Sequence, residues 1–289
     1  MRILVLRGGA LGDLIVTLPA LALLRGHWPD ARIELVGNAT AGALALGARL
    51  VDMVHSQHES RWAALYGGSP LPPALAAWLA GFDLVLTFWP DPAGELQRRF
   101  PVRVGQTVLA AAVLPTLAPA AAHYCAPLRH FGLIPASLGF ALRQPAPTPR
   151  LMALHPGSGS PRKNWPVERW HALAHWLERE CGARVLVISG EAEPADLLAG
   201  IGEPVRHLPL GDLADRLAQC ELFVGHDSGI SHLAATTGVP LLLLFGPTDP
   251  AMWAPPTPRT RVLRSGADVA AIALADVQRA IRAALPGQT

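Results

Sequence analysis

The chain has 289 residues, of which 51% are hydrophobic and 16% are charged. It is therefore long and apolar enough for two α/β domains with cores of their own. The 24 Lys and Arg residues barely exceed the 22 Asp and Glu residues. Nucleic-acid-binding proteins usually carry a strong basic stripe, so we expect no nucleic-acid partner. The three cysteines are far apart in sequence, which argues against a disulfide framework and favours a reducing, cytoplasmic compartment.

Apolar strands and amphipathic helices alternate along the first half of the chain, which predicts βαβ units and a parallel sheet. Residues 3–6 form a continuous apolar run, and residues 11–24 have leucines at helical spacing. Further strands are expected at residues 32–36, 51–54, 83–87 and 98–104.

A Pro-rich, polar segment at residues 142–150 is typical of a linker. After it the alternation restarts, with strands expected at 151–154, 184–189, 222–224, 240–245 and 261–263 and helices at 166–181, 212–219, 228–237 and 273–285. We therefore predict two facing Rossmann-like domains, 1–145 and 146–289, with parallel sheets and a cleft between them. The closing helix, 273–285, could pack back on the N-terminal domain. Ligands of such sheets bind at the carboxyl ends of the strands.

The first candidate site is the Gly-rich turn after the first strand, which contains Gly9, Ala10, Gly12 and Asp13. Its spacing matches neither a dinucleotide fingerprint nor a Walker A loop. Asp13 is either a general base or an ordinary helix N-terminal acid that favours the helix dipole.

The second candidate site is the loop at residues 155–166, where Ser158, Gly159 and Lys163 lie among small residues. Lys163 is the only lysine in the chain. Exposed backbone N–H groups, hydroxyls and a cation beside a helix start predict a pocket for phosphates. The alternative is a surface loop that happens to be rich in Gly and Ser.

The third candidate site follows the strand expected at 222–224. Asp227 or Ser228 could cap the next helix, Gly229 leaves its first turn bare for a pyrophosphate, and His232 lies on the same face as Ser228. The alternative is a plain capping motif with a half-buried histidine. Glu191, after another strand, could bind a ribose, or be an exposed acid at a helix start.

Metal-binding motifs are not found: the sequence has no H-E-x-x-H, no H-x-x-E-H and no D-x-D between a strand and a helix. We therefore expect neither a metal nor another cofactor.

In combination, three segments resemble glycosyltransferase family 9, the ADP-heptose:lipopolysaccharide heptosyltransferases, which have the GT-B fold. They are Gly12-Asp13 with Thr17-Leu18-Pro19-Ala20-Leu21, then His155-Pro156-Gly157-Ser158 through Lys163-Asn164-Trp165-Pro166, and Asp227-Ser228-Gly229-Ile230-Ser231-His232 continuing to Phe245-Gly246-Pro247-Thr248-Asp249-Pro250.

This resemblance implies an inverting, metal-independent enzyme that transfers heptose from ADP-heptose to a hydroxyl of the lipopolysaccharide core or a related glycan. Asp13 would deprotonate the acceptor, with Gly9, Ala10 and Gly12 on the acceptor side. Lys163 would neutralise the pyrophosphate. The remaining donor-binding residues would be Ser158, Gly159, Glu191, Asp227, Ser228, Gly229 and His232. The partners would be the nucleotide sugar and a glycan or lipid-linked acceptor, which implies peripheral contact with the inner membrane; the oligomeric state stays open.

One departure from the family concerns Gly8-Gly9-Ala10, where relatives usually have hydroxyl residues before the Gly-Asp pair. It leaves open a family-9-like transferase that uses a protein, a small molecule or another polysaccharide as acceptor, or a different nucleotide sugar. Two other classes of protein are alternatives. A sugar-nucleotide epimerase needs more acids and histidines near Asp13, and a non-enzymatic binding module predicts that Asp13 can be lost without consequence.

Overall fold

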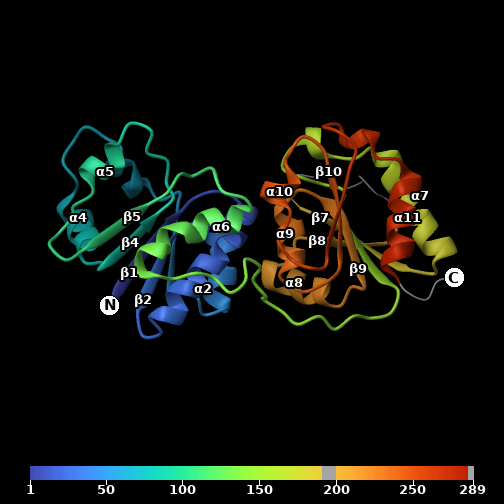
Figure 1. Ribbon diagram of the computed structural model, residues 1–289, viewed down its shortest axis with the longest axis horizontal. Helices are drawn as coiled ribbons and strands as arrows, with labels where there is room; N and C mark the ends of the chain where they lie inside the picture. The colour runs from blue at the N-terminus through green and yellow to red at the C-terminus, as the bar shows by residue number, and fades with distance from the viewer. Residues whose placement is uncertain (191–199, 286–289) are drawn as a thin grey trace. The chain divides into compact units, whose positions relative to one another are not determined.

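The computed structural model describes residues 1–190 and 200–285 and divides the chain into two compact units, Met1–Leu138 and Gly139–Thr289. Each unit is a parallel β-sheet with helices (Figure 1). Buried parallel strands need near-continuous apolar sequences, because helices cover both faces of the sheet. The apolar runs at the start of each half of the chain therefore become strands that lie inside a sheet.

The sheet of the first unit has five strands in the order β3-β2-β1-β4-β5. These strands are β1 (Arg2–Arg7), β2 (Arg32–Gly37), β3 (Met53–Ser56), β4 (Leu84–Thr87) and β5 (Thr107–Ala110). The α-helices are α1 (Leu11–Ile15), α2 (Leu18–His27), α3 (Ala39–Gly47), α4 (Pro73–Ala80), α5 (Glu95–Arg99) and α6 (Ala120–Cys125), with 3-10 helices η1 (Ser60–Leu65) and η2 (Ala126–Phe131). All strand pairs are parallel, so the carboxyl ends of β1 and β4 meet at one edge.

The core of the first unit lies between its central strands and the helices around them. Leu4 and Leu6 of β1 pack with Leu75 and Leu79 of α4 on one face of the sheet. Helices α2 and α6 pack against each other on the other face (Figure 1). Because β1 is in the middle of the sheet and buried, the turn that follows it is held in a defined position.

The sheet of the second unit has six strands in the order β11-β10-β9-β6-β7-β8. These strands are β6 (Leu151–Leu154), β7 (Arg184–Ser189), β8 (Glu203–Arg206), β9 (Leu222–His226), β10 (Leu241–Phe245) and β11 (Thr260–Arg264). The α-helices are α7 (Val167–Glu180), α8 (Leu210–Ala218), α9 (Gly229–Ala235), α10 (Pro250–Trp253) and α11 (Leu274–Ala284), with 3-10 helices η3 (Pro161–Lys163) and η4 (Val269–Ala271).

The core of the second unit is dominated by α7 and α11 on one face of this sheet, with α8 and α9 on the other (Figure 1). Trp170 of α7 is fully buried, and Val277 and Ile281 of α11 belong to the same cluster. The apolar face of the closing helix is therefore part of the second unit. The neighbouring strands β6 and β9 end side by side, which brings the Lys163 loop and the Asp227 turn together.

The helix expected at residues 11–24 is broken into α1 and α2. In a continuous helix the carbonyl of Asp13 would accept from the amide of Thr17. Instead that carbonyl accepts from the Thr17 hydroxyl at 2.8 Å and from Arg7 Nε at 3.1 Å. The Thr17 amide donates to the carbonyl of Leu14. Pro19 cannot donate at all, because it has no N–H. The single-helix prediction is therefore wrong.

The prediction of a strand at residues 98–104 is also wrong. Asp91 accepts hydrogen bonds from the amides of Leu96 and Gln97, both at 2.9 Å, and α5 forms there in place of a strand. The strand lies further along, at β5. Strand β3 begins two residues after the expected start, and β8, an edge strand that contains Pro204, was not predicted.

Candidate functional site

Asp13 lies in the first turn of α1, directly after the Gly-rich turn that follows β1. Its Oδ2 accepts from the amide of Ala10 at 2.9 Å, and its Oδ1 accepts from Arg7 Nη2 at 2.9 Å. The side chain is 36% exposed, so the carboxylate is held firmly and yet reachable. The amide contact is the one expected of a helix N-terminal acid, and the ion pair is a feature beyond that role.

Arg7 is the residue that orients Asp13. Its side chain is 1% exposed, its Nε also contacts the Thr17 hydroxyl at 3.0 Å, and its guanidinium lies 4.3 Å from the ring centre of Tyr124. A buried guanidinium has to be paired, because an unpaired buried charge is costly. Arg7 therefore pairs with the Asp13 carboxylate and fixes its direction.

Gly9 makes room for this arrangement. Its φ of +112° is strained for other residues, and a Cβ at this position would lie 2.4 Å from Asp13 Oδ2. The side chain of Gln57 closes the turn from outside, accepting from the Gly9 amide at 2.9 Å and donating to its carbonyl at 3.3 Å. Gly12 lies inside α1, where its carbonyl accepts from Val16.

Lys163 ends the short 3-10 helix η3 in the loop between β6 and α7. Its Nζ lies 3.0 Å from Asp227 Oδ2. The lysine side chain is 22% exposed and the aspartate side chain 9% exposed. The two side chains come from segments 64 residues apart in sequence, and they meet because β6 and β9 are neighbours in the sheet.

His226, the last residue of β9, fastens the Lys163 loop at both ends. The amide of Trp165 donates to His226 Nε2 at 2.8 Å, so the ring proton is on Nδ1, which faces the Gly157 carbonyl at 3.3 Å. Burial lowers the pKa of His226 to about 3, and the charges of His155 and Lys163 add to this effect. The imidazole is therefore neutral at physiological pH, which keeps Nε2 available as an acceptor.

Ser228 is the N-cap of α9, and its Oγ accepts from the amide of Ser231 at 3.2 Å. Gly229 is the first residue of the helix, and the amide of His232 donates to the Ser228 carbonyl. Asp227, Ser228 and His232 are all buried. The capping prediction for Ser228 is confirmed, and the helix begins immediately after the aspartate that pairs with Lys163.

The remaining residues predicted to bind the donor sugar nucleotide take no part in the Lys163–Asp227 pair. The hydroxyl of Ser158 lies 2.6 Å from Asn164 Oδ1 and 2.8 Å from the Ser160 carbonyl, so it stabilises the loop from within. Gly159 is exposed, and a Cβ there would meet nothing within 4 Å. Glu191 lies outside the described residues.

Arg7 and His226 are the supporting residues that the sequence analysis missed. Each was visible as a polar residue at the carboxyl end of an apolar strand, immediately before a candidate motif. A charged or ring-nitrogen side chain that completes a buried strand is expected to have a fixed partner. That signal could have identified both positions.

Two features are absent from the described residues, 1–190 and 200–285. No group of three or more His, Cys, Asp or Glu side chains there could hold a metal ion. No helix there is long and apolar enough to span a bilayer.

With this geometry in view, comparison with known proteins decides the family. Residues 128–278, just over half of the chain, match the model of glycosyltransferase family 9 (heptosyltransferase). The chain belongs to glycosyltransferase family 9. The matched range includes both the Lys163 loop and the Asp227 turn, so the expected resemblance is confirmed where the second unit has its buried ion pair.

Curated relatives in family 9 are similar over part of their length. The chain is 40% identical over 107 residues to lipopolysaccharide heptosyltransferase 1 of Pseudomonas aeruginosa, covering 35% of this chain and 30% of that protein. It is 31% identical over 120 residues to lipooligosaccharide heptosyltransferase 2 of Haemophilus influenzae, covering 36% of this chain and 33% of that protein. The alignments thus span about a third of these curated relatives.

Solved family-9 structures share the fold over the whole chain. E. coli heptosyltransferase WaaC, solved with ADP, has a TM-score of 0.76 at 19% identity and covers 99% of this chain and 100% of its own. The same enzyme has also been solved with ADP-2-deoxy-2-fluoro heptose, with a TM-score of 0.75. The prediction of a GT-B fold with two parallel-sheet α/β domains is confirmed.

Proposed function

We propose that this family-9 member is an inverting, metal-independent glycosyltransferase that moves heptose from ADP-heptose to a hydroxyl group of the lipopolysaccharide core or a related glycan. The observation that carries the proposal is the Lys163–Asp227 pair at the start of α9. It joins a partly exposed cation to a helix beginning, and both attract a diphosphate.

In this proposal the second unit binds the donor. Lys163 contacts the diphosphate and balances the charge that builds up on it as it leaves, which is the role of a metal ion in other transferases. Asp227 accepts hydrogen bonds from the heptose hydroxyls, and Ser228 and Gly229 present the first turn of α9 to phosphate. Ser158, Gly159 and His232 complete the donor site, and Glu191 is assigned to the ribose.

The first unit binds the acceptor, with Gly9, Ala10 and Gly12 in the turn that holds the base. The acceptor oxygen forms a bond to the anomeric carbon while the bond from that carbon to the diphosphate oxygen breaks. Asp13 takes the proton of the acceptor hydroxyl, and ADP leaves. Because the acceptor would be lipid-linked, we place the reaction in the cytoplasm, in peripheral contact with the inner membrane.

A thermal-shift panel of ADP-heptose, UDP-glucose and GDP-mannose tests the donor assignment. A ligand that binds only the folded state raises the melting temperature. We expect a shift with ADP-heptose and none with the other two nucleotide sugars at equal concentration. A larger shift with a UDP- or GDP-sugar would favour the alternative, a family-9-like transferase with another donor.

The same enzyme preparation tests the metal assignment. Activity with ADP-heptose should be unchanged after dialysis against EDTA. A loss of activity that Mg²⁺ or Mn²⁺ restores would contradict metal independence.

A further inference from the structure

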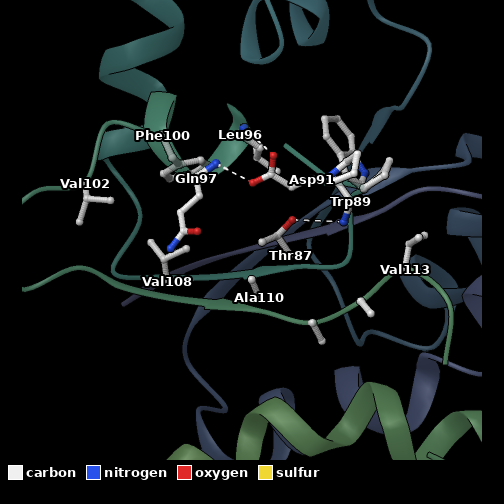
Figure 2. A pocket seen from close by; sticks show the side chains of 14 residues that line it. Thr87, Trp89, Asp91, Leu96, Gln97, Phe100, Val102, Val108, Ala110 and Val113 are labelled. Carbon is white, nitrogen blue, oxygen red and sulfur yellow. Dashed lines mark hydrogen bonds between the residues drawn. The ribbon is translucent and has the colours of Figure 1, made fainter. Parts of the chain in front are cut away.

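The first unit contains an apolar cavity of about 650 Å³ beside the carboxyl ends of β4 and β5 (Figure 2). Its apolar walls include Trp89, Leu96, Phe100, Val108, Ala110 and Val113. The volume falls within the range of small-molecule sites, about 300–1,000 Å³, which are mostly apolar with a few polar groups. The cavity is thus large enough for a small molecule, and its lining is of the kind found in ligand sites.

The polar side chains around this cavity are largely occupied by the protein itself (Figure 2). The Asp91 carboxylate accepts from the amides of Leu96 and Gln97, and Thr87 Oγ1 accepts from the amide of Trp89 at 3.2 Å. The side-chain amide of Gln97, unlike its backbone amide, makes no hydrogen bond within the part of the chain that the structure describes. An anionic group would lose its water here without gaining a cationic partner, because no Lys or Arg is among the residues that line the cavity. The cavity therefore selects an apolar, uncharged group.

A second pocket, of about 530 Å³, adjoins the first. Trp89 and Pro90 line both pockets. The second pocket is walled by aromatic rings, since Trp89 stacks on Tyr66 and meets Trp62 edge to face. Flat aromatic surfaces with a polar rim suit sugar rings, because apolar C–H faces can pack on them while hydroxyls reach polar groups.

This aromatic pocket reaches the turn that holds Asp13. Gly8 and Gln57 line it, and the same Gln57 side chain bonds the amide and carbonyl of Gly9. Gly9 in turn lies against the Asp13 carboxylate. Within the first unit, the apolar cavity, the aromatic pocket and the turn that holds Asp13 are therefore neighbours in that order.

We propose that the acceptor is amphiphilic: its sugar ring lies in the aromatic pocket against the partly exposed Tyr66, and an apolar substituent, aryl or short alkyl, enters the cavity beside Trp89. The inference rests on the proposed function in assigning the acceptor to the first unit. Beyond that function, it names the class of acceptor: one with an uncharged apolar group close to the reacting hydroxyl.

The fluorescent probe N-phenyl-1-naphthylamine, which is uncharged and apolar, tests the cavity directly. The full chain should bind it saturably at one site. Ala110→Trp, which fills the cavity from its exposed wall, should weaken binding at least tenfold. Ala43→Trp on the exposed side of α3 is the matched control and should bind like the wild type. Thermal unfolding of both variants checks that they fold, and Val108→Trp fills the cavity from a second position.

Competition then tests the acceptor class. Phenyl β-glucoside should displace the probe at a concentration at least tenfold lower than methyl β-glucoside, because only the former has a group for the cavity. No saturable probe binding, equal binding by Ala110→Trp and the wild type, or equal displacement by the two glucosides would each overturn the inference. The donor assignment is tested separately by the ADP-heptose shift, so either proposal can fail while the other stands.

Discussion

Lys163 Nζ and Asp227 Oδ2 form an ion pair 3.0 Å long in the second unit, and the aspartate is the more deeply buried partner. Removing the lysine alone would leave a buried carboxylate without its cation, which is more costly than removing both charges. The pair thus has a structural role, and the exposed part of Lys163 remains available for an anion.

A double-mutant cycle measures this coupling. Lys163→Met and Asp227→Asn should each lower the free energy of unfolding. The loss of unfolding free energy in the double variant should be smaller than the sum of the two single losses, by about 1–3 kcal/mol. Chemical unfolding of the four proteins provides the values. Strict additivity would mean that the two side chains do not interact.

Asp13→Asn should abolish transfer and leave donor binding intact. The single side-chain oxygen of Asn can accept from Ala10 or from Arg7 but not from both, and it cannot take a proton; loss of a general base costs roughly 10²–10⁴-fold in rate. Turnover and calorimetric ADP affinity are measured on the same preparation. Asp268→Asn is the control, because Asp268 also caps a helix, accepting from Ala270 at 2.9 Å, and should retain normal turnover. Near-normal turnover of Asp13→Asn would remove the general-base role.

Gly9→Ala should also reduce transfer, for a steric reason. Its Cβ would lie 2.4 Å from Asp13 Oδ2 at a φ of +112°, so the carboxylate would have to move away from its Arg7-bound position. We expect a loss of turnover with unchanged ADP affinity. Gly47→Ala, where a Cβ meets nothing within 4 Å, is the control. Normal turnover of Gly9→Ala would show that the position of Asp13 is not critical.

His226→Gln and His226→Phe separate the two hydrogen bonds of His226 from its ring. Gln can accept from Trp165 and donate to Gly157, whereas Phe fills similar space and does neither. The Phe variant leaves the buried Trp165 amide unpaired, which costs about 1–3 kcal/mol. We expect weaker ADP binding for Phe and near-wild-type binding for Gln. Equal affinity of Phe and wild type would show that the Lys163 loop does not depend on His226.

The same residue predicts a pH dependence of stability. The pKa of His226 is about 3 in the folded chain, against 6.5 for an ordinary histidine. Between these values the unfolded chain binds a proton that the folded chain does not, so stability falls as the pH falls through this window. Between pH 7 and pH 5, His226 alone should lower the free energy of unfolding by about 2 kcal/mol. Urea unfolding at both pH values should show that His226→Gln loses less stability than the wild type; an equal loss would contradict the low pKa.

Much of the fold could be predicted because buried parallel strands have an unmistakable apolar pattern. Strands β7 and β10 and helices α7 and α11 lie where the sequence predicts them to within a residue or two. The errors arose where local hydrogen bonds compete with periodicity. The carbonyl of Asp13 is taken by Arg7 and the Thr17 hydroxyl, and the carboxylate of Asp91 starts a helix in place of a strand.

The candidate site divides in the same way. Residues in motifs, such as Lys163, Asp227 and Ser228, could be identified by residue type and spacing. The supporting contacts could not, because they join positions far apart in sequence. Trp165 and His226 are separated by 61 residues and Gly9 and Gln57 by 48; only the strand order brings each pair together.

The central claim is that Lys163 binds the diphosphate of the donor, and calorimetric titration of ADP tests it most directly. Lys163→Met removes the cation, and Arg162→Met removes its exposed neighbour as a control for general charge. A hydrogen bond to a charged group contributes about 1.5–3 kcal/mol. We expect Lys163→Met to weaken ADP binding at least tenfold and Arg162→Met to change it less than threefold. Equal ADP affinity of the wild type and Lys163→Met would contradict it.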